Sequence, residues 1–230
     1  MRILERQKNK LELIDKLFKI HNNLNFIGNL KTEIPEQLMT FKYLTPTDCV
    51  LELGGSCRNS CVINYVLENK KNHVVIEPAK KELDILKKNR DNNNLEFQIE
   101  NSAISNKPLF SLGWHTYDKK IPGSVPVNTI TFNQIKLKYK LAFTTLIIDN
   151  EGNFVDMLKA FPNIIKNIRL IVIEHDFNSF DDLNYFNNTL TENNFKLVDK
   201  MLKNDEYCPG DNWRHGLVGD PIFVSVWKRQ

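Results

Sequence analysis

Short apolar runs that alternate with amphipathic stretches are the feature that most limits what this chain can fold into. Five runs read as buried strands, at residues 49–53, 73–78, 95–99, 145–149 and 170–174. Residues 58–69, 79–92, 153–161 and about 181–194 follow helical spacing. Strands that alternate with helices predict a parallel sheet, and continuous rather than alternating apolar runs predict burial on both faces.

The C-terminal part departs from this alternation. Residues 195–201 and 222–227 read as two strands without a helix between them, so we expect an antiparallel pair at one edge. The predicted fold class is therefore α/β, a doubly wound, mostly parallel seven-stranded sheet with an antiparallel C-terminal edge pair. Two long connections, at about 106–128 and 203–221, are expected to be functional loops.

The first 44 residues precede the strand pattern and predict two helices, one over residues 4–21 and one that begins after Pro35. A chain of 230 residues with 41% hydrophobic side chains can form one sizeable core. We therefore predict a helical extension at 1–44 and one α/β domain at 45–230. The extension is expected to cap the site, to form a homodimer face, or to join a fusion partner.

Charge and cysteine content disfavour several classes of protein. The 31 basic and 28 acidic residues are too evenly balanced to indicate a nucleic-acid or membrane-surface binder. The four cysteines lack zinc-site spacing and are expected to be reduced thiols. No apolar run approaches the roughly 20 residues of a membrane span. The charged N-terminus is unlike a signal peptide, so we expect a cytoplasmic protein.

Acidic residues stand at the ends of the predicted strands, where an open parallel sheet binds its ligands. The Gly-x-Gly-x-x-Gly pattern of dinucleotide sites is missing after the first strand. Glu52 suits a ligand with an amine and a sulfonium. Glu77 can accept both ribose hydroxyls, or belong to the start of a helix. The expected ligand contacts are Glu52, Gly54, Gly55, Ser56, Glu77, Pro78, Asn101, Ser102, Ala103 and Asp149.

Four stretches together resemble the class I S-adenosylmethionine-dependent methyltransferases and, more narrowly, the FkbM family. They are residues 50–55, 75–78, 101–103 and 148–152, the last similar to an Ile-Asp-Val-Glu-Gly-like motif. The Glu-x-Gly-Gly variant of the motif and the high content of Asn and Lys look like those of family members encoded by large DNA viruses. This chain departs from the pattern at Asn150, usually apolar, and at Ser56 and Arg58, where many methyltransferases have glycines.

The resemblance implies methyl transfer from S-adenosylmethionine to a hydroxyl, with S-adenosylhomocysteine as the product. The acceptor is expected to be a glycan or a small molecule. If the chain is viral, the protein is expected to lie in the host cytoplasm. Because the methyl sulfonium is already activated, the protein must align the oxygen with the S–CH3 bond and remove a proton.

Two roles compete for the polar residues that follow the fourth and fifth strands. In one, Asp149, Glu151 or His175 is a general base. In the other, Asp149 with Glu174 and Asp176 binds Mg or Mn, which lowers the pKa of the hydroxyl. A purely structural role for the cluster stays open, and Glu151 is alternatively a helix cap.

The two long connections are expected to form the acceptor wall, because aromatic faces and polar side chains hold sugars. The same rings could instead pin their loops to the core. The candidates are Trp114, His115 and Tyr117 in the first connection and Tyr207, Trp213, Arg214 and His215 in the second.

A nucleic-acid methyltransferase is the nearest alternative function. Residues 149–152 contain neither the Asn/Asp-Pro-Pro-Tyr/Phe run of exocyclic-amine enzymes nor the Pro-Cys of cytosine-C5 enzymes. Residues 174–176 contain no lysine, unlike the Lys-Asp-Lys-Glu set of ribose enzymes. These differences disfavour nucleic acid as the acceptor. A non-catalytic scaffold that retains the fold is the third hypothesis.

Overall fold

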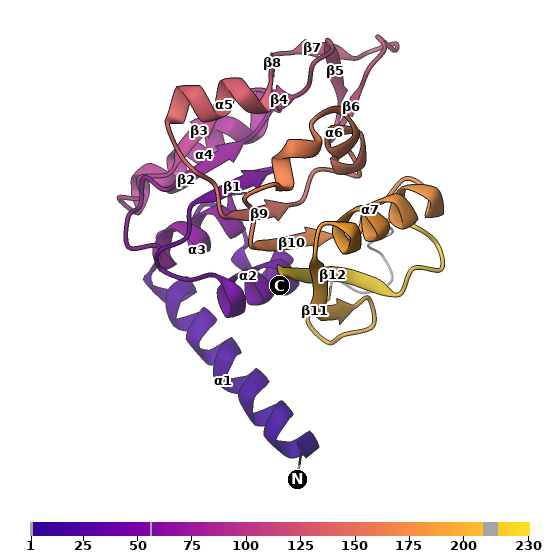
Figure 1. Ribbon diagram of the computed structural model, residues 1–230. Coiled ribbons are helices and arrows are strands. Elements are labelled where there is room, and N and C mark those ends of the chain that lie inside the picture. The colour runs from indigo at the N-terminus through magenta and orange to yellow at the C-terminus, as the bar shows by residue number, and fades with distance from the viewer. Residues whose placement is uncertain (1, 56, 209–215) are drawn as a thin grey trace.

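A seven-stranded sheet forms the centre of the computed structural model, which describes residues 2–55, 57–208 and 216–230. The spatial order of the strands is β11-β12-β10-β9-β1-β2-β3 (Figure 1). β12 runs antiparallel to both of its neighbours, β10 and β11, and the other neighbouring pairs in this sheet are parallel. The predicted fold class is therefore confirmed. The strands are β1 (Val50–Leu53), β2 (His73–Ile76), β3 (Gln98–Glu100), β9 (Thr145–Ile148), β10 (Leu170–Glu174), β11 (Phe195–Leu202) and β12 (Ile222–Arg229).

Helices cover both faces of the sheet (Figure 1). In β9, Leu146 and Ile148 lie in one core and Ile147 lies in the other, because successive strand residues point to opposite faces. This double burial explains why the strands read as continuous apolar runs. The helices are α1 (Arg2–Asn23), α2 (Ile34–Tyr43), α3 (Arg58–Val66), α4 (Lys80–Asn92), α5 (Phe132–Tyr139), α6 (Phe154–Ala160) and α7 (Phe180–Glu192), with 3-10 turns at Leu30–Glu33 and Pro162–Ile165.

The N-terminal helices share one of these cores. Leu17 of α1 and Leu38 of α2 are buried together with Val172 of β10 and Val224 of β12. The N-terminal part of α1 projects away from the body of the molecule (Figure 1). Because α2 packs on β10 and β12, its first turn reaches the carboxyl edge of the sheet. None of the helices in the described part of the chain combines the length and apolar character that crossing a bilayer requires.

The segment 106–128 is not the loop that we predicted. It contains a three-stranded antiparallel sheet, here called the flap, in the order β6-β5-β7. Each strand has only three or four residues, too few for a period-2 pattern to be recognised, and β7 contains Pro126. The flap strands are β5 (Leu109–Leu112), β6 (His115–Tyr117) and β7 (Val125–Val127), and β4 (Ala103–Ile104) pairs with β8 (Thr129–Ile130) at the flap's base.

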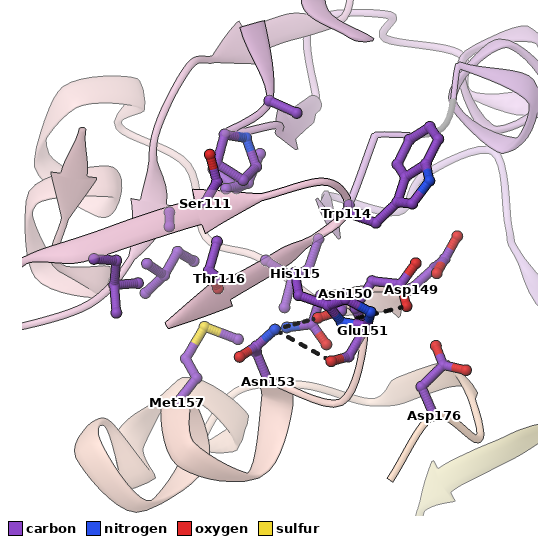
Figure 2. A pocket seen from close by; sticks show the side chains of 18 of the residues that line it. Ser111, Trp114, His115, Thr116, Asp149, Asn150, Glu151, Asn153, Met157 and Asp176 are labelled. Atoms are coloured by element: carbon purple, nitrogen blue, oxygen red, sulfur yellow. Dashed lines mark hydrogen bonds and ion pairs between the residues drawn. The ribbon is translucent and has the colours of Figure 1, made fainter. Parts of the chain in front are cut away.

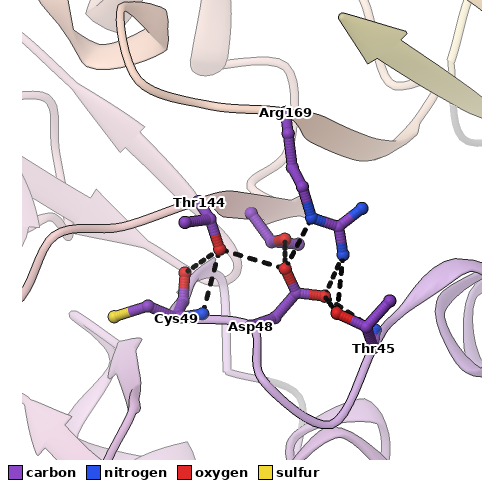
Figure 3. A network of polar contacts seen from close by, with 6 residues as sticks. Thr45, Asp48, Cys49, Thr144 and Arg169 are labelled. Atoms are coloured by element: carbon purple, nitrogen blue, oxygen red, sulfur yellow. Dashed lines mark hydrogen bonds and ion pairs between the residues drawn. The ribbon is translucent and has the colours of Figure 1, made fainter.

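A buried ionic network fixes the opposite, amino edge of the sheet (Figure 3). The carboxylate of Asp48 accepts hydrogen bonds from Thr45, Thr144, Thr145 and Arg169. Burial alone would raise the pKa of Asp48, but the hydrogen bonds from Thr45 and Arg169 hold that pKa below its usual value. These residues precede or begin β1, β9 and β10, so the network aligns the starts of three neighbouring strands.

Candidate functional site

A cavity of about 1150 Å³ lies at the carboxyl edge of the sheet (Figure 2). Parallel strands bring their carboxyl ends to one edge, and four of those ends line this cavity. Gly54 follows β1, Glu77 follows β2, Asp149 follows β9 and Asp176 follows β10. The sequence-predicted convergence of these strand ends on one cavity is therefore present.

The glycines after β1 allow close packing of the strand ends, and Gly54, unlike Gly55, also lines the cavity. Gly54 has φ +83°, and a Cβ added there would lie 1.6 Å from the carbonyl oxygen of Asp149. A Cβ on Gly55 would lie 2.3 Å from Cγ1 of Val75. Only glycine allows the turn after β1 to pass this close to the end of β9. Ser56, the next predicted contact, lies outside the described residues.

Glu52 lies beside the cavity rather than on its wall. The side chain is buried, and one carboxylate oxygen is 2.9 Å from Nε2 of His73. The other oxygen, Oε1, has no hydrogen-bond partner among the described residues. Glu52 lines a small adjoining pocket together with Gly54, Glu36 and Asp149. The structure thus leaves one buried carboxylate oxygen unsatisfied next to the main cavity.

Glu77 is the acidic residue of the wall near β2. Burial, partly opposed by hydrogen bonds from the backbone N–H groups of Ala79 and Gly55, raises the pKa of Glu77 to about 7. Asn101 donates to the carbonyl oxygen of Glu77 at 2.8 Å and so braces this turn from β3. The remaining predicted contacts divide between the wall, which contains Pro78 and Ala103, and positions behind it, which hold Asn101 and Ser102.

Three acidic side chains at the ends of β9 and β10 lie close together. Asp149, Glu174 and Asp176 each offer a carboxylate oxygen within 4.8 Å of the others. Burial raises the pKa of Asp149 and of Glu174 well above the usual range, and repulsion adds to it, chiefly from Glu33 on Asp149 and from Asp149 on Glu174. Burial and the charge of Glu151 raise the pKa of Asp176 to about 7. Such a cluster can hold a proton at neutral pH or bind a cation.

Sequence reasoning missed Glu36 of α2, which lines the same cavity and interacts with Glu174. Its side chain is only 5% exposed. Burial, with repulsion from Glu33, raises the pKa of Glu36 well above the usual range. An acidic residue in the first turn of a helix is ordinary, because it complements the helix dipole. No local signal therefore distinguishes Glu36 from any other residue near a helix start.

His175 is not in the cavity wall, although it follows β10. Its Nδ1 lies 2.7 Å from Asp220, and its Nε2 lies 2.8 Å from the hydroxyl of Ser225. The ring is 3% exposed and is absent from the cavity lining. With both nitrogens engaged by buried partners, the imidazole has no free position from which to take a proton from an acceptor. The geometry gives His175 a structural position instead of the catalytic one predicted.

The flap supplies the opposite wall of the cavity, with Trp114 and His115 among the lining residues (Figure 2). Tyr117 of the flap also lines the cavity. Trp114 is 63% exposed, so a large ring stands over the cavity without being part of the core. Nδ1 of His115 lies 4.0 Å from a carboxylate oxygen of Glu151. Glu151 has φ 55°, a strained conformation for a residue other than glycine.

Among its described residues, the second long connection supplies none of the cavity lining. Tyr207 packs against the core shared with the N-terminal helices, and Nζ of Lys10 lies 4.9 Å from its ring centroid. Tyr207 therefore pins its own segment, which is the alternative considered for these rings. The other predicted residues of this connection, Trp213, Arg214 and His215, lie outside the described residues.

Comparison with known proteins identifies the fold. No family model and no curated protein matches the chain. The ribosomal protein L11 methylase of Lactobacillus delbrueckii subsp. bulgaricus matches with TM-score 0.51 and 12% identity, over 89% of this chain and 81% of that one. An rRNA methylase of Streptococcus thermophilus matches with TM-score 0.51 and 9% identity, over 82% and 90% respectively.

An O-methyltransferase of Bacillus cereus, solved in complex with SAH, matches with TM-score 0.50 and 12% identity, over 96% of this chain and 91% of that one. At such low identity, these similarities establish a fold and not a substrate. The chain has the Rossmann-like fold of the S-adenosylmethionine-dependent methyltransferases.

Proposed function

We propose that this protein is an S-adenosylmethionine-dependent O-methyltransferase that acts on a hydroxyl group of a glycan or small molecule. The observation that carries the proposal is the single cavity on which the ends of β1, β2, β9 and β10 converge. The methyltransferase fold favours this chemistry, and the name of the Bacillus cereus neighbour includes O-methylation. Membership of the FkbM family, a viral origin and a cytoplasmic location are parts of the proposal that rest on the sequence alone.

The residues of the cavity fit the cofactor. Glu77 would accept the ribose hydroxyls, and the wall at Pro78 and Ala103 would contact the adenine. The unsatisfied oxygen of Glu52 would receive the amine, across the turn at Gly54. S-adenosylmethionine would supply an activated methyl group when bound. The volume of about 1150 Å³ is enough for a nucleoside together with an acceptor.

Asp149 is the residue that we assign to proton removal, with Glu151 as the second candidate. With the methyl donor bound, the carboxylate of Asp149 would take the proton that the acceptor hydroxyl loses as its oxygen is methylated. A carboxyl group with a raised pKa is a stronger base once ionised. The alternative role for Asp149, Glu174 and Asp176 is to hold Mg or Mn, which would lower the pKa of the hydroxyl.

The charge of the cavity supports a neutral or cationic acceptor. Among the described residues, ten carboxylic acids line the cavity, against three lysines or arginines. Two of those three basic side chains are already paired, Arg58 with Glu33 and Lys159 with Asp182. A nucleic-acid backbone would meet net repulsion at such a surface. A nucleic-acid methyltransferase remains the second candidate, because one neighbour is named an rRNA methylase.

Thermal shift with S-adenosylhomocysteine tests the proposal most directly. A ligand that binds only the folded state raises the melting temperature by mass action, by an amount that corresponds to about 2.7 kcal/mol at 100 times its Kd. We expect a shift for the natural protein, a smaller one for Glu77→Ala, and the full shift for Glu68→Ala, an exposed control outside the cavity. No shift at millimolar ligand would contradict the proposal and favour the scaffold hypothesis.

A further inference from the structure

His73 is a buried titratable side chain to which the proposed function gives no role. It begins β2 and lines neither the main cavity nor the small pocket beside it. In the register of the sheet, His73 lies opposite Val50 of β1, two residues before Glu52. Because every second residue of a strand points to the same face, His73 and Glu52 lie on one face of neighbouring strands. The histidine therefore approaches Glu52 from the amino side, away from the cavity at the carboxyl edge.

The contact between these two side chains is direct and buried. Nε2 of His73 lies 2.9 Å from Oε2 of Glu52, and the two side chains are 0% and 2% exposed. Nδ1 of His73 is buried and has no hydrogen-bond partner among the described residues. Since a carboxylate oxygen only accepts, Nε2 is the nitrogen that carries the donated proton. This bond fixes one oxygen of Glu52 and with it the orientation of the carboxylate.

The second oxygen of Glu52, Oε1, is left without a partner at the small pocket. Asn59 and Glu36 line the same pocket, and each also has one buried side-chain oxygen that is unpartnered within the described part of the chain. The pocket has a volume of about 10 Å³, close to the least that holds one water-sized group. Because buried acceptors are costly when unsatisfied, a group with several N–H donors suits this pocket. A primary ammonium group carries three such donors.

We propose that His73 is a positioning residue, which orients Glu52 so that Oε1 accepts a hydrogen bond from the ammonium group of S-adenosylmethionine. This inference rests on the proposed function and adds to it the residue that sets the geometry of Glu52. Without His73, both oxygens of Glu52 would be buried without a partner, and the side chain could adopt other rotamers. His73 therefore affects binding of the amino-acid end of the cofactor and not binding of the adenosine.

Isothermal titration calorimetry with two ligands tests this inference. S-adenosylhomocysteine has the amino-acid end, whereas 5′-methylthioadenosine keeps the adenosine and the thioether but lacks that end. His73→Leu should raise the Kd for S-adenosylhomocysteine about tenfold, as expected when one charge-assisted hydrogen bond is lost. The Kd for 5′-methylthioadenosine should not change. His73→Gln, which keeps an N–H donor, should recover most of the affinity for S-adenosylhomocysteine.

A double variant shows whether His73 acts through Glu52. In a Glu52→Gln background, His73→Leu should have little further effect on the Kd for S-adenosylhomocysteine, because the two changes remove the same interaction. Full additivity of the two effects would contradict the positioning role.

His21→Leu is the matched control. His21 is also buried, its Nε2 lies 2.7 Å from Oε1 of Gln37, and its Nδ1 has no partner among the described residues. Because His21 lies in α1, outside both pockets, this variant should lower the melting temperature without changing either Kd. Circular dichroism establishes that each variant is folded.

The outcomes separate this inference from the proposed function. Equal loss of affinity for both ligands in folded His73→Leu, or no loss for either, would overturn the inference and leave the proposed function standing. A natural protein that binds S-adenosylhomocysteine no more tightly than 5′-methylthioadenosine would do the same. Failure of the natural protein to bind either ligand would overturn both.

Discussion

Burial governs how single side chains behave at the strand ends. The sequence indicates correctly that Glu77 and Asp149 stand at the cavity, because each follows directly on a buried strand. It does not indicate their proton affinity, since that depends on the neighbours that the fold brings near. Glu77 has a pKa of about 7 because it is buried, and Glu82 and Glu52 add repulsion.

The affinity for S-adenosylhomocysteine should therefore depend on pH. Ribose hydroxyls donate to an ionised Glu77, so binding needs the deprotonated form. Below about pH 7 the free protein carries a proton on Glu77, and affinity falls as the pH falls. One pH unit below the pKa, about a tenth of the groups are ionised, so Kd should rise about tenfold between pH 8 and pH 6.

Isothermal titration calorimetry at several pH values measures this dependence. The matched variant Glu77→Gln should bind more weakly and show little variation of Kd over the same range. A natural protein whose Kd is constant from pH 8 to pH 6 would contradict the role assigned to Glu77.

At the scale of elements, the sequence predicts which strands are parallel and which are antiparallel. It predicts the first and last residue of each strand less well. The predicted strand at 170–174 matches β10, whereas the strand predicted at 95–99 is β3, Gln98–Glu100. Phe97 is buried against α3 and α4 rather than paired in β3. Its apolar side chain therefore made the predicted strand begin too early in the sequence. The flap was missed because its short strands are stabilised by one another and not by a long local pattern.

Removing the guanidinium from the amino edge should destabilise the sheet without affecting the cavity. Arg169→Met would leave the buried carboxylate of Asp48 without its charged donor (Figure 3). Loss of such a partner typically costs about 1–3 kcal/mol. For a chain of this size, the melting temperature should fall by about 2–4 °C for each kcal/mol.

Calorimetry and ligand titration separate these two effects. Lys166→Met, an exposed neighbour on the same connection, should change the melting temperature little. The Kd for S-adenosylhomocysteine should be the same in all three proteins. A large loss of affinity in a folded Arg169→Met protein would show that the two edges are coupled.

For the whole molecule, the acidic cavity should make the metal-free protein more stable in mild acid. The pKa values of Glu36, Asp149 and Glu174 are raised well above the range that these groups have when unfolded. The folded state therefore binds more protons, and the stability that this gives is lost as the pH rises through the folded-state pKa values. Asp48 and Asp220, whose pKa values are lowered, affect stability only in stronger acid.

Scanning calorimetry in EDTA should give a higher melting temperature at pH 5.5 than at pH 8. His21 opposes this trend, because burial lowers its pKa. The comparison with Glu36→Gln isolates the cluster: this variant should melt higher than the natural protein at pH 8 and differ less at pH 5.5. A variant that melts lower at pH 8 would show that Glu36 stabilises the metal-free fold.

The sequence by itself determined the sheet and the identity of the residues at its carboxyl edge. Apolar runs define the strands, and parallel strands necessarily bring their ends to one side, which places Glu77, Asp149 and Asp176 together. Only the tertiary structure decided that Glu36 joins them and that His175 turns away. Both outcomes depend on packing between segments distant in the chain, where the burial and contacts of each side chain are set by neighbours that no local pattern encodes.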